Sequence, residues 1–104
     1  MKKIKIEVIA TTFNEDIAKQ YASEGLTACT YNKVGQVFYS DGWQKPDGLC
    51  SNAWLCMREY VFALSHGGKD FFDGWLKDEN TAIISCNDGT RPVIYKIEPA
   101  DETA

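Results

Sequence analysis

The chain opens with an alternation of apolar and charged side chains. From Lys3 to Ile9, apolar residues recur at every second position, and lysine or glutamate falls between them. A period of two places successive side chains on opposite faces of a strand. The pattern therefore predicts a strand with one buried face, formed by Ile4, Ile6 and Val8.

The clearest helical pattern lies between residues 52 and 65. At about 100° per residue, its apolar side chains form one stripe, made up of Ala53, Met57, Tyr60, Val61 and Leu64. Ser51 or Asn52 is a suitable N-cap, and the Gly67-Gly68 pair supplies the left-handed residue that commonly ends a helix. We expect this helix to be the longest in the chain.

Leu55 and Phe62 lie together on the opposite face of the same helix. A helix that is apolar on two sides usually has a second contact. In a monomer, either the loop that carries Trp43 or the apolar turn from Phe71 to Trp75 would cover this face. Alternatively, Leu55 and Phe62 form the interface of a homodimer.

A second, shorter helix is expected near the N-terminus. Thr12 and Glu15 have the spacing of a capping box. The helix should run to about residue 22, and Gly25 would prevent it from continuing. Its predicted buried side chains are Ile17, Ala18 and Tyr21.

Three further segments rich in β-branched and aromatic residues predict strands at 36–40, 81–86 and 93–98. The last two flank the Asn87-Asp88-Gly89-Thr90 turn, in which Asp-Gly suits positive φ, so they should form a hairpin. Together the elements predict one α+β domain over 1–98 and a frayed polar tail over 99–104. We expect a mostly antiparallel sheet of about four strands, with one long central helix and one or two short helices packed on it.

Charge and composition narrow the classes of function. The net charge of −4 argues against nucleic-acid binding, which requires a basic face. No apolar run approaches the roughly 20 residues that span a bilayer, and the N-terminus lacks the apolar core of a signal peptide. We therefore expect a cytoplasmic protein that binds neither nucleic acid nor membranes and whose cysteines stay reduced.

Three of the four cysteines lie at the ends of predicted elements. Cys29 lies in irregular chain before a strand, Cys50 immediately precedes the long helix, and Cys86 ends a strand. The free amides at the helix N-terminus favour a thiolate at Cys50. Convergence of these three thiols is one hypothesis. Cys56 falls beside the apolar stripe and is expected to be a small buried hydrophobe.

Three converging thiolates would suit zinc or an iron–sulfur cluster, with His66 or water as a fourth ligand. The chain contains no Cys-x-x-Cys pair. His66, the only histidine, should lie roughly 20 Å from Cys50, because the helix rises 1.5 Å per residue between them. We therefore expect His66 to contact the C-terminal carbonyls of the helix instead.

The same cysteines belong to short motifs that span nearly the whole chain. The motifs are Cys29 with Val34-Gly35-Gln36-Val37-Phe38, Gly48-Leu49-Cys50 with Ala53-Trp54, Leu64 with Gly67-Gly68, and Cys86-x-Asp88 with Pro92-Val93-Ile94-Tyr95. Through them the chain resembles an uncharacterised family of small three-cysteine proteins, of about ninety residues per unit, found mainly in anaerobic bacteria and archaea. The resemblance implies a shared site at Cys29, Cys50 and Cys86 and names no activity.

Three functions stay open at this point. The first is a small cytoplasmic binding or accessory domain whose three-cysteine site takes a soft metal or an electrophilic small ligand. The second is a thiol-dependent redox or nucleophilic enzyme that uses Cys50. The third is a structural or interaction module with inert buried cysteines. Arg91, beside the Asp88-Gly89 turn, either binds an anion or makes a local contact.

Overall fold

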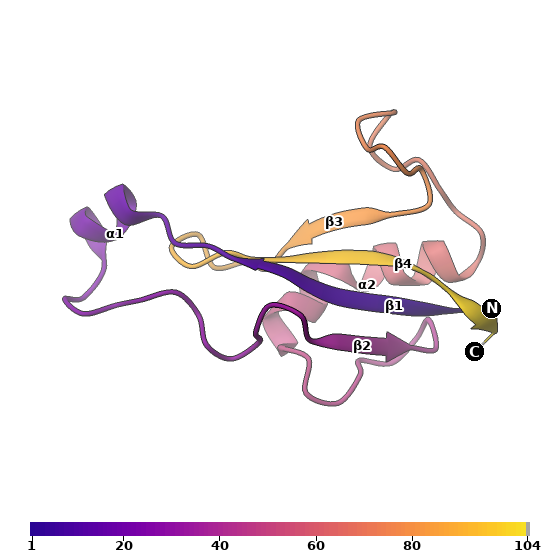
Figure 1. The fold of residues 1–104 in the computed structure, drawn as a ribbon, viewed down its shortest axis with the longest axis horizontal. Helices are drawn as coiled ribbons and strands as arrows, with labels where there is room; N and C mark the ends of the chain where they lie inside the picture. Colours follow the sequence, from indigo (N-terminus) through magenta and orange to yellow (C-terminus); the bar gives the residue numbers. More distant parts are fainter. Residues whose placement is uncertain (104) are drawn as a thin grey trace.

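The computed structural model describes residues 1–103 and forms an α+β domain with a four-stranded antiparallel sheet. The strands lie in the order β2-β1-β4-β3, so the two long strands β1 and β4 occupy the centre (Figure 1). In chain order the elements are β1 (Lys2–Thr11), α1 (Glu15–Tyr21), β2 (Val37–Ser40), α2 (Ser51–Ser65), β3 (Ala82–Ser85) and β4 (Val93–Thr103).

The buried face of the sheet is built from rows of apolar side chains that cross the strands. Ile6 lies between Phe38 and Ile97, and Ile97 in turn pairs with Ala82. The alternation in β1 is confirmed, because Ile4, Ile6 and Val8 are fully buried. Helix α2 covers this face and contributes the predicted core residues Ala53, Met57, Val61 and Leu64.

Helix α2 begins one residue earlier than the pattern predicts and has a different N-cap. Cys50 occupies the cap position, and no side chain caps the first turn, so the prediction of a Ser51 or Asn52 cap was wrong. The C-terminal prediction is confirmed, because Gly67 takes a φ of +88° directly after the last turn. That left-handed conformation suits glycine, which has no Cβ to clash with the backbone.

The predicted β3–β4 hairpin is present, with a longer loop than a two-residue turn. Gly89 has no positive φ, so the expected role of the Asp-Gly pair was wrong. The side chain of Asp88 shapes the loop instead, by accepting hydrogen bonds from the amides of Thr90 and Arg91.

Beyond the predicted strand, β4 continues through 99–103, the segment predicted to be a frayed tail, and Lys2 of β1 pairs with Thr103. Residue 104 lies outside the described residues.

Helix α1 differs most from its prediction. Thr12 is not its cap: the N-cap is Asn14, without a side-chain cap hydrogen bond, and the Thr12 hydroxyl donates to the carbonyl of Pro92. Of the three side chains expected to be buried, Ala18 is buried, whereas Ile17 and Tyr21 are 48% and 82% exposed. The helix lies beyond one end of the sheet (Figure 1), so the prediction that the short helix packs on the sheet was wrong.

The second apolar face of α2 is partly covered by the loop before it. Trp43 packs edge-to-face on Phe62, with ring centroids 4.9 Å apart, while Leu55 is 66% exposed. Gly42 permits this approach, because a Cβ at that residue would lie 2.7 Å from the Ser65 hydroxyl. The Phe71–Trp75 turn packs instead on Tyr60, through Phe71 and Phe72. The homodimer through Leu55 and Phe62 stays a prediction.

We expect Met57→Ala to lower the free energy of unfolding by about 2–5 kcal/mol, because it leaves a cavity between α2 and the sheet. Met57 is fully buried. Leu55→Ala, on the exposed face of the same helix, is the matched control and should change it by less than about 1 kcal/mol. Urea unfolding followed by circular dichroism measures both. Equal effects of the two substitutions would contradict this assignment of the helix faces.

Candidate functional site

Three cysteines from three separate parts of the fold line one cavity. Cys29 comes from the loop between α1 and β2, Cys50 from the N-cap of α2, and Cys86 from the residue directly after β3. The cavity has a volume of about 190 Å³ and is called the thiol cavity below. Its other lining residues are Tyr31, Asn32, Asn52, Asn87, Asp88, Arg91, Val93 and Tyr95. The structure thus brings together the three thiols that the sequence singled out.

Asn32 joins the segments that form this cavity. Its side chain is buried, and its Oδ1 accepts hydrogen bonds from the Cys50 amide and the Tyr95 hydroxyl, both at 3.0 Å. Its Nδ2 donates to the carbonyl of Gly48, also at 3.0 Å. One amide side chain therefore connects the loop that carries Cys29, the start of α2 and strand β4.

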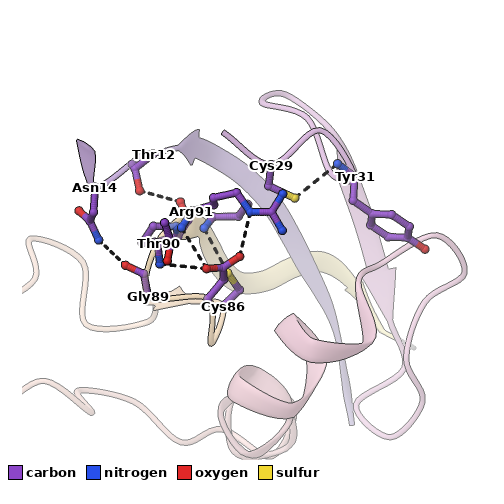
Figure 2. Close-up of polar contacts among 11 residues, drawn as sticks. Thr12, Asn14, Cys29, Tyr31, Cys86, Gly89, Thr90 and Arg91 are labelled. Carbon is purple, nitrogen blue, oxygen red and sulfur yellow. Dashed lines mark hydrogen bonds and ion pairs between the residues drawn. The ribbon is translucent and has the colours of Figure 1, made fainter. Parts of the chain in front are cut away.

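The three sulfur atoms differ in their hydrogen bonds. The Cys29 sulfur accepts from the Tyr31 amide at 3.4 Å, and the Cys86 sulfur accepts from the Val93 amide at 3.3 Å. Both bonds orient the sulfur against its own loop, and the first is drawn in Figure 2. Within residues 1–103, the Cys50 sulfur has no hydrogen-bond partner. Of the three thiols that line the cavity, Cys50 is therefore the one least engaged by hydrogen bonds.

Tyr95 forms a buried wall of the thiol cavity. Its neighbours on the sheet are Val8 and Ile84, and its hydroxyl faces Asn32. Burial raises the pKa of Tyr95 well above its ordinary value of 10.0, and nearby Cys50, Cys86 and Cys29 raise it further. These effects favour the neutral phenol, which can keep donating to Asn32.

The β3–β4 loop is held in place from two sides. Internally, Asp88 accepts hydrogen bonds from the Thr90 and Arg91 amides and from Arg91 Nε, the last at 3.0 Å. These amides, followed by Arg91, lower the pKa of Asp88. Externally, Thr12 and Asn14 bind the loop carbonyls, as Figure 2 shows. The local contact predicted for Arg91 is confirmed, and the loop presents Cys86 and Arg91 on a fixed backbone.

The remaining cysteine and the histidine lie outside the cavity lining. Cys56 packs against the core, as predicted, but it is only partly buried rather than buried. Burial raises the pKa of its thiol, with Cys86 and Cys50 adding to the shift. His66 Nδ1 lies 2.8 Å from the Phe62 carbonyl oxygen. The predicted contact of His66 with the end of the helix is therefore confirmed.

The cavity does not have the ligand arrangement of a metal centre. In the part of the chain that the structure describes, no group of three or more His, Cys, Asp or Glu side chains could hold a metal ion. All four cysteines are free thiols. The prediction of zinc or an iron–sulfur cluster at Cys29, Cys50 and Cys86 gains no support from this geometry, although the three residues share a cavity.

Comparison with known protein families, curated proteins and solved structures finds no match to this chain. The resemblance to the three-cysteine family therefore stays a prediction. Among residues 1–103, none of the helices has the length and apolar character that crossing a membrane requires.

Sequence reasoning missed Asn32, and it placed Tyr95 in the Cys86 motif without giving it a role at the site. Asn32 lies in an irregular stretch, where an asparagine is most simply a turn residue, and the partners that connect it to the site, Gly48, Cys50 and Tyr95, come from other segments. The sequence pattern indicates the burial of Tyr95, because Tyr95 and Ile97 share one face of the predicted strand 93–98. That signal predicts burial and says nothing of the cysteines.

We expect Asn32→Ala to destabilise the fold by about 1–3 kcal/mol, because it leaves the Cys50 amide and the Gly48 carbonyl without their buried partner. Asn80→Ala is the control, since Asn80 is exposed and its side chain makes no hydrogen bond among the described residues. Urea unfolding measures both variants. A loss no larger than that of the control would show that Asn32 does not tie the site together.

The raised pKa of Tyr95 leads us to expect a loss of stability in alkali. An unfolded chain releases the phenol proton near pH 10, whereas the folded protein retains it because its pKa is raised. The unfolded state then binds fewer protons, so the free energy of unfolding falls as pH rises above about 10. In urea unfolding from pH 8 to 11, the stability advantage of wild type over Tyr95→Phe should shrink above pH 10. Tyr21→Phe controls for removal of an exposed hydroxyl. A constant advantage over this range would contradict the burial of Tyr95.

Proposed function

We propose that this protein is a small cytoplasmic binding domain whose site is the thiol cavity, with Cys50 as the thiol that meets the ligand. One observation carries the proposal: the Cys50 sulfur has no hydrogen-bond partner among the described residues, and it lies in a cavity that it shares with two other thiols. Its position as N-cap of α2 adds the positive end of the helix dipole.

The cavity limits the size and chemistry of the ligand. Its volume of about 190 Å³ is below the roughly 300–1,000 Å³ of drug-sized ligand pockets. It suits a molecule of a few heavy atoms. Sulfur is a soft nucleophile in its thiolate form, so the matching ligand carries an electrophilic centre that thiols attack.

A thiol enzyme that uses Cys50 as its nucleophile is the second candidate, and the same free sulfur supports it. Binding is favoured because no base for the thiol faces it. The cavity lining contains no histidine, and its carboxylate, Asp88, already accepts from Arg91. An inert structural role for the cysteines is the third alternative, which the experiment below addresses.

Two further features support parts of the proposal. The four free cysteines suit a reducing compartment such as the cytoplasm. The three cysteines of the proposed site are those that carry the resemblance to the three-cysteine family, so membership of that family belongs to the same proposal.

Native-state alkylation tests the role of Cys50. With substoichiometric N-ethylmaleimide, followed by peptide mass spectrometry, we expect Cys50 to react at least roughly tenfold faster than Cys56, because burial hinders the thiolate form of Cys56. Cys50→Ser should remove the fast phase, and the control Cys56→Ser should keep it. Equal, slow modification of all four cysteines would favour inert residues and exclude both thiol-based functions.

A further inference from the structure

We infer that the thiol cavity selects negatively charged electrophiles and that Arg91 determines this specificity. The inference rests on the proposed function, because it concerns the ligand of the same cavity. It names a ligand class: a small anion, such as a carboxylate, that carries an electrophilic carbon.

The first support is the set of donors left free on Arg91. Its Nε donates to Asp88 Oδ2 at 3.0 Å, and this is the only ion pair of Arg91 in the described residues. The terminal Nη groups have no hydrogen-bond partner there. Guanidinium Nη groups bind carboxylates in a fixed, two-pronged geometry. Arg91 lines the thiol cavity, and its Nη groups are therefore unused donors at that cavity.

The second support is the orientation of the arginine. Figure 2 shows its side chain extending from the β3–β4 loop toward Cys29, and both residues line the thiol cavity. The Asp88 carboxylate fixes Nε, while Thr12 and Asn14 fix the loop backbone. A guanidinium held in this way loses less side-chain entropy when it binds an anion.

The third support is the start of α2. The amides of Ser51 and Asn52 have no acceptor among the described residues, and Asn52 lines the cavity. These amides and the helix dipole favour negative charge. The cavity has one carboxylate, Asp88, and three donors already satisfy it: the amides of Thr90 and Arg91, and Arg91 Nε.

The charge of the whole protein makes the inference testable. Its net charge is −4, so the overall field repels anions. A preference of Cys50 for an anionic reagent would therefore have to arise from local donors.

Iodoacetate and iodoacetamide form a matched pair of probes, one anionic and one neutral. With either probe, the sulfur forms a bond to the CH₂ carbon, the carbon–iodine bond breaks, iodide leaves and the thiol proton passes to the buffer. We would measure the rate at Cys50 with each reagent by peptide mass spectrometry. The rate with iodoacetate is divided by the rate with iodoacetamide. This ratio is then divided by the same ratio for N-acetylcysteine amide, a neutral free thiol, to give a normalised ratio.

We expect this normalised ratio to be about five in the native protein, a factor that matches an ion pair at a partly exposed site. Arg91→Gln should bring it to within about twofold of one. Arg58→Gln is the control, because it removes the same charge from an exposed position of α2 outside the thiol cavity. It should leave the ratio high.

A second measurement needs no variant, so it stands even if Arg91→Gln unfolds the loop. Raising the sodium chloride concentration should lower the normalised ratio of the wild-type protein, because salt screens the ion pair. If Cys50 reacts fast with both reagents at a normalised ratio near one, the inference is wrong and the proposed function stands. If Cys50 reacts no faster than Cys56 with either reagent, both are wrong.

Discussion

The candidate site depends on one buried amide. Asn32 accepts from the Cys50 amide and the Tyr95 hydroxyl and donates to the Gly48 carbonyl. A buried polar side chain costs free energy unless its hydrogen bonds are made. The loop, the helix start and the strand must therefore meet in one arrangement for Asn32 to be satisfied. The same arrangement brings Cys29, Cys50 and Cys86 to one cavity.

The sheet supplies the rigid side of this arrangement. Tyr95 lies in a central strand, and Val8 and Ile84 flank it on the neighbouring strands. Cys86 follows β3, and its amide and sulfur both bond to Val93 at the start of β4. Two of the cavity thiols thus lie at the ends of regular elements, Cys50 at the start of α2 and Cys86 directly after β3, while Cys29 comes from the loop between α1 and β2.

The parts of the fold that were predictable are those in which a side-chain period determines burial. Ile4, Ile6 and Val8 alternate and are buried, and Met57 and Val61 follow the helical stripe and are buried. Helix α1 was mispredicted because burial needs a surface as well as a pattern. Thr12 and Asn14 bind the β3–β4 loop. Because of these contacts, the segment between β1 and α1 runs past the end of the sheet before α1 begins. Ile17 is then left without a face to cover.

The candidate site was predictable only in part, for a related reason. The ends of elements are visible in the sequence, so the convergence of three cysteines was a reasonable hypothesis. The strand order and the role of Asn32 depend on contacts between residues far apart in the chain, such as Asn32 with Tyr95. Metal binding was the weaker part of that hypothesis, because thiols can share a cavity without standing as the ligands of one ion.

Cys29, Cys50 and Cys86 line one cavity, and cross-linking is the most direct measurement of their proximity. A short bis-maleimide, added to native protein at low concentration, should bridge Cys50 to Cys29 or to Cys86 within one chain. Peptide mass spectrometry identifies the bridge, and urea-unfolded protein is the control for proximity by chance. We expect these bridges in the native protein and a much lower yield after unfolding. Native protein that forms no bridge among the three cysteines would show that their thiols do not share one cavity.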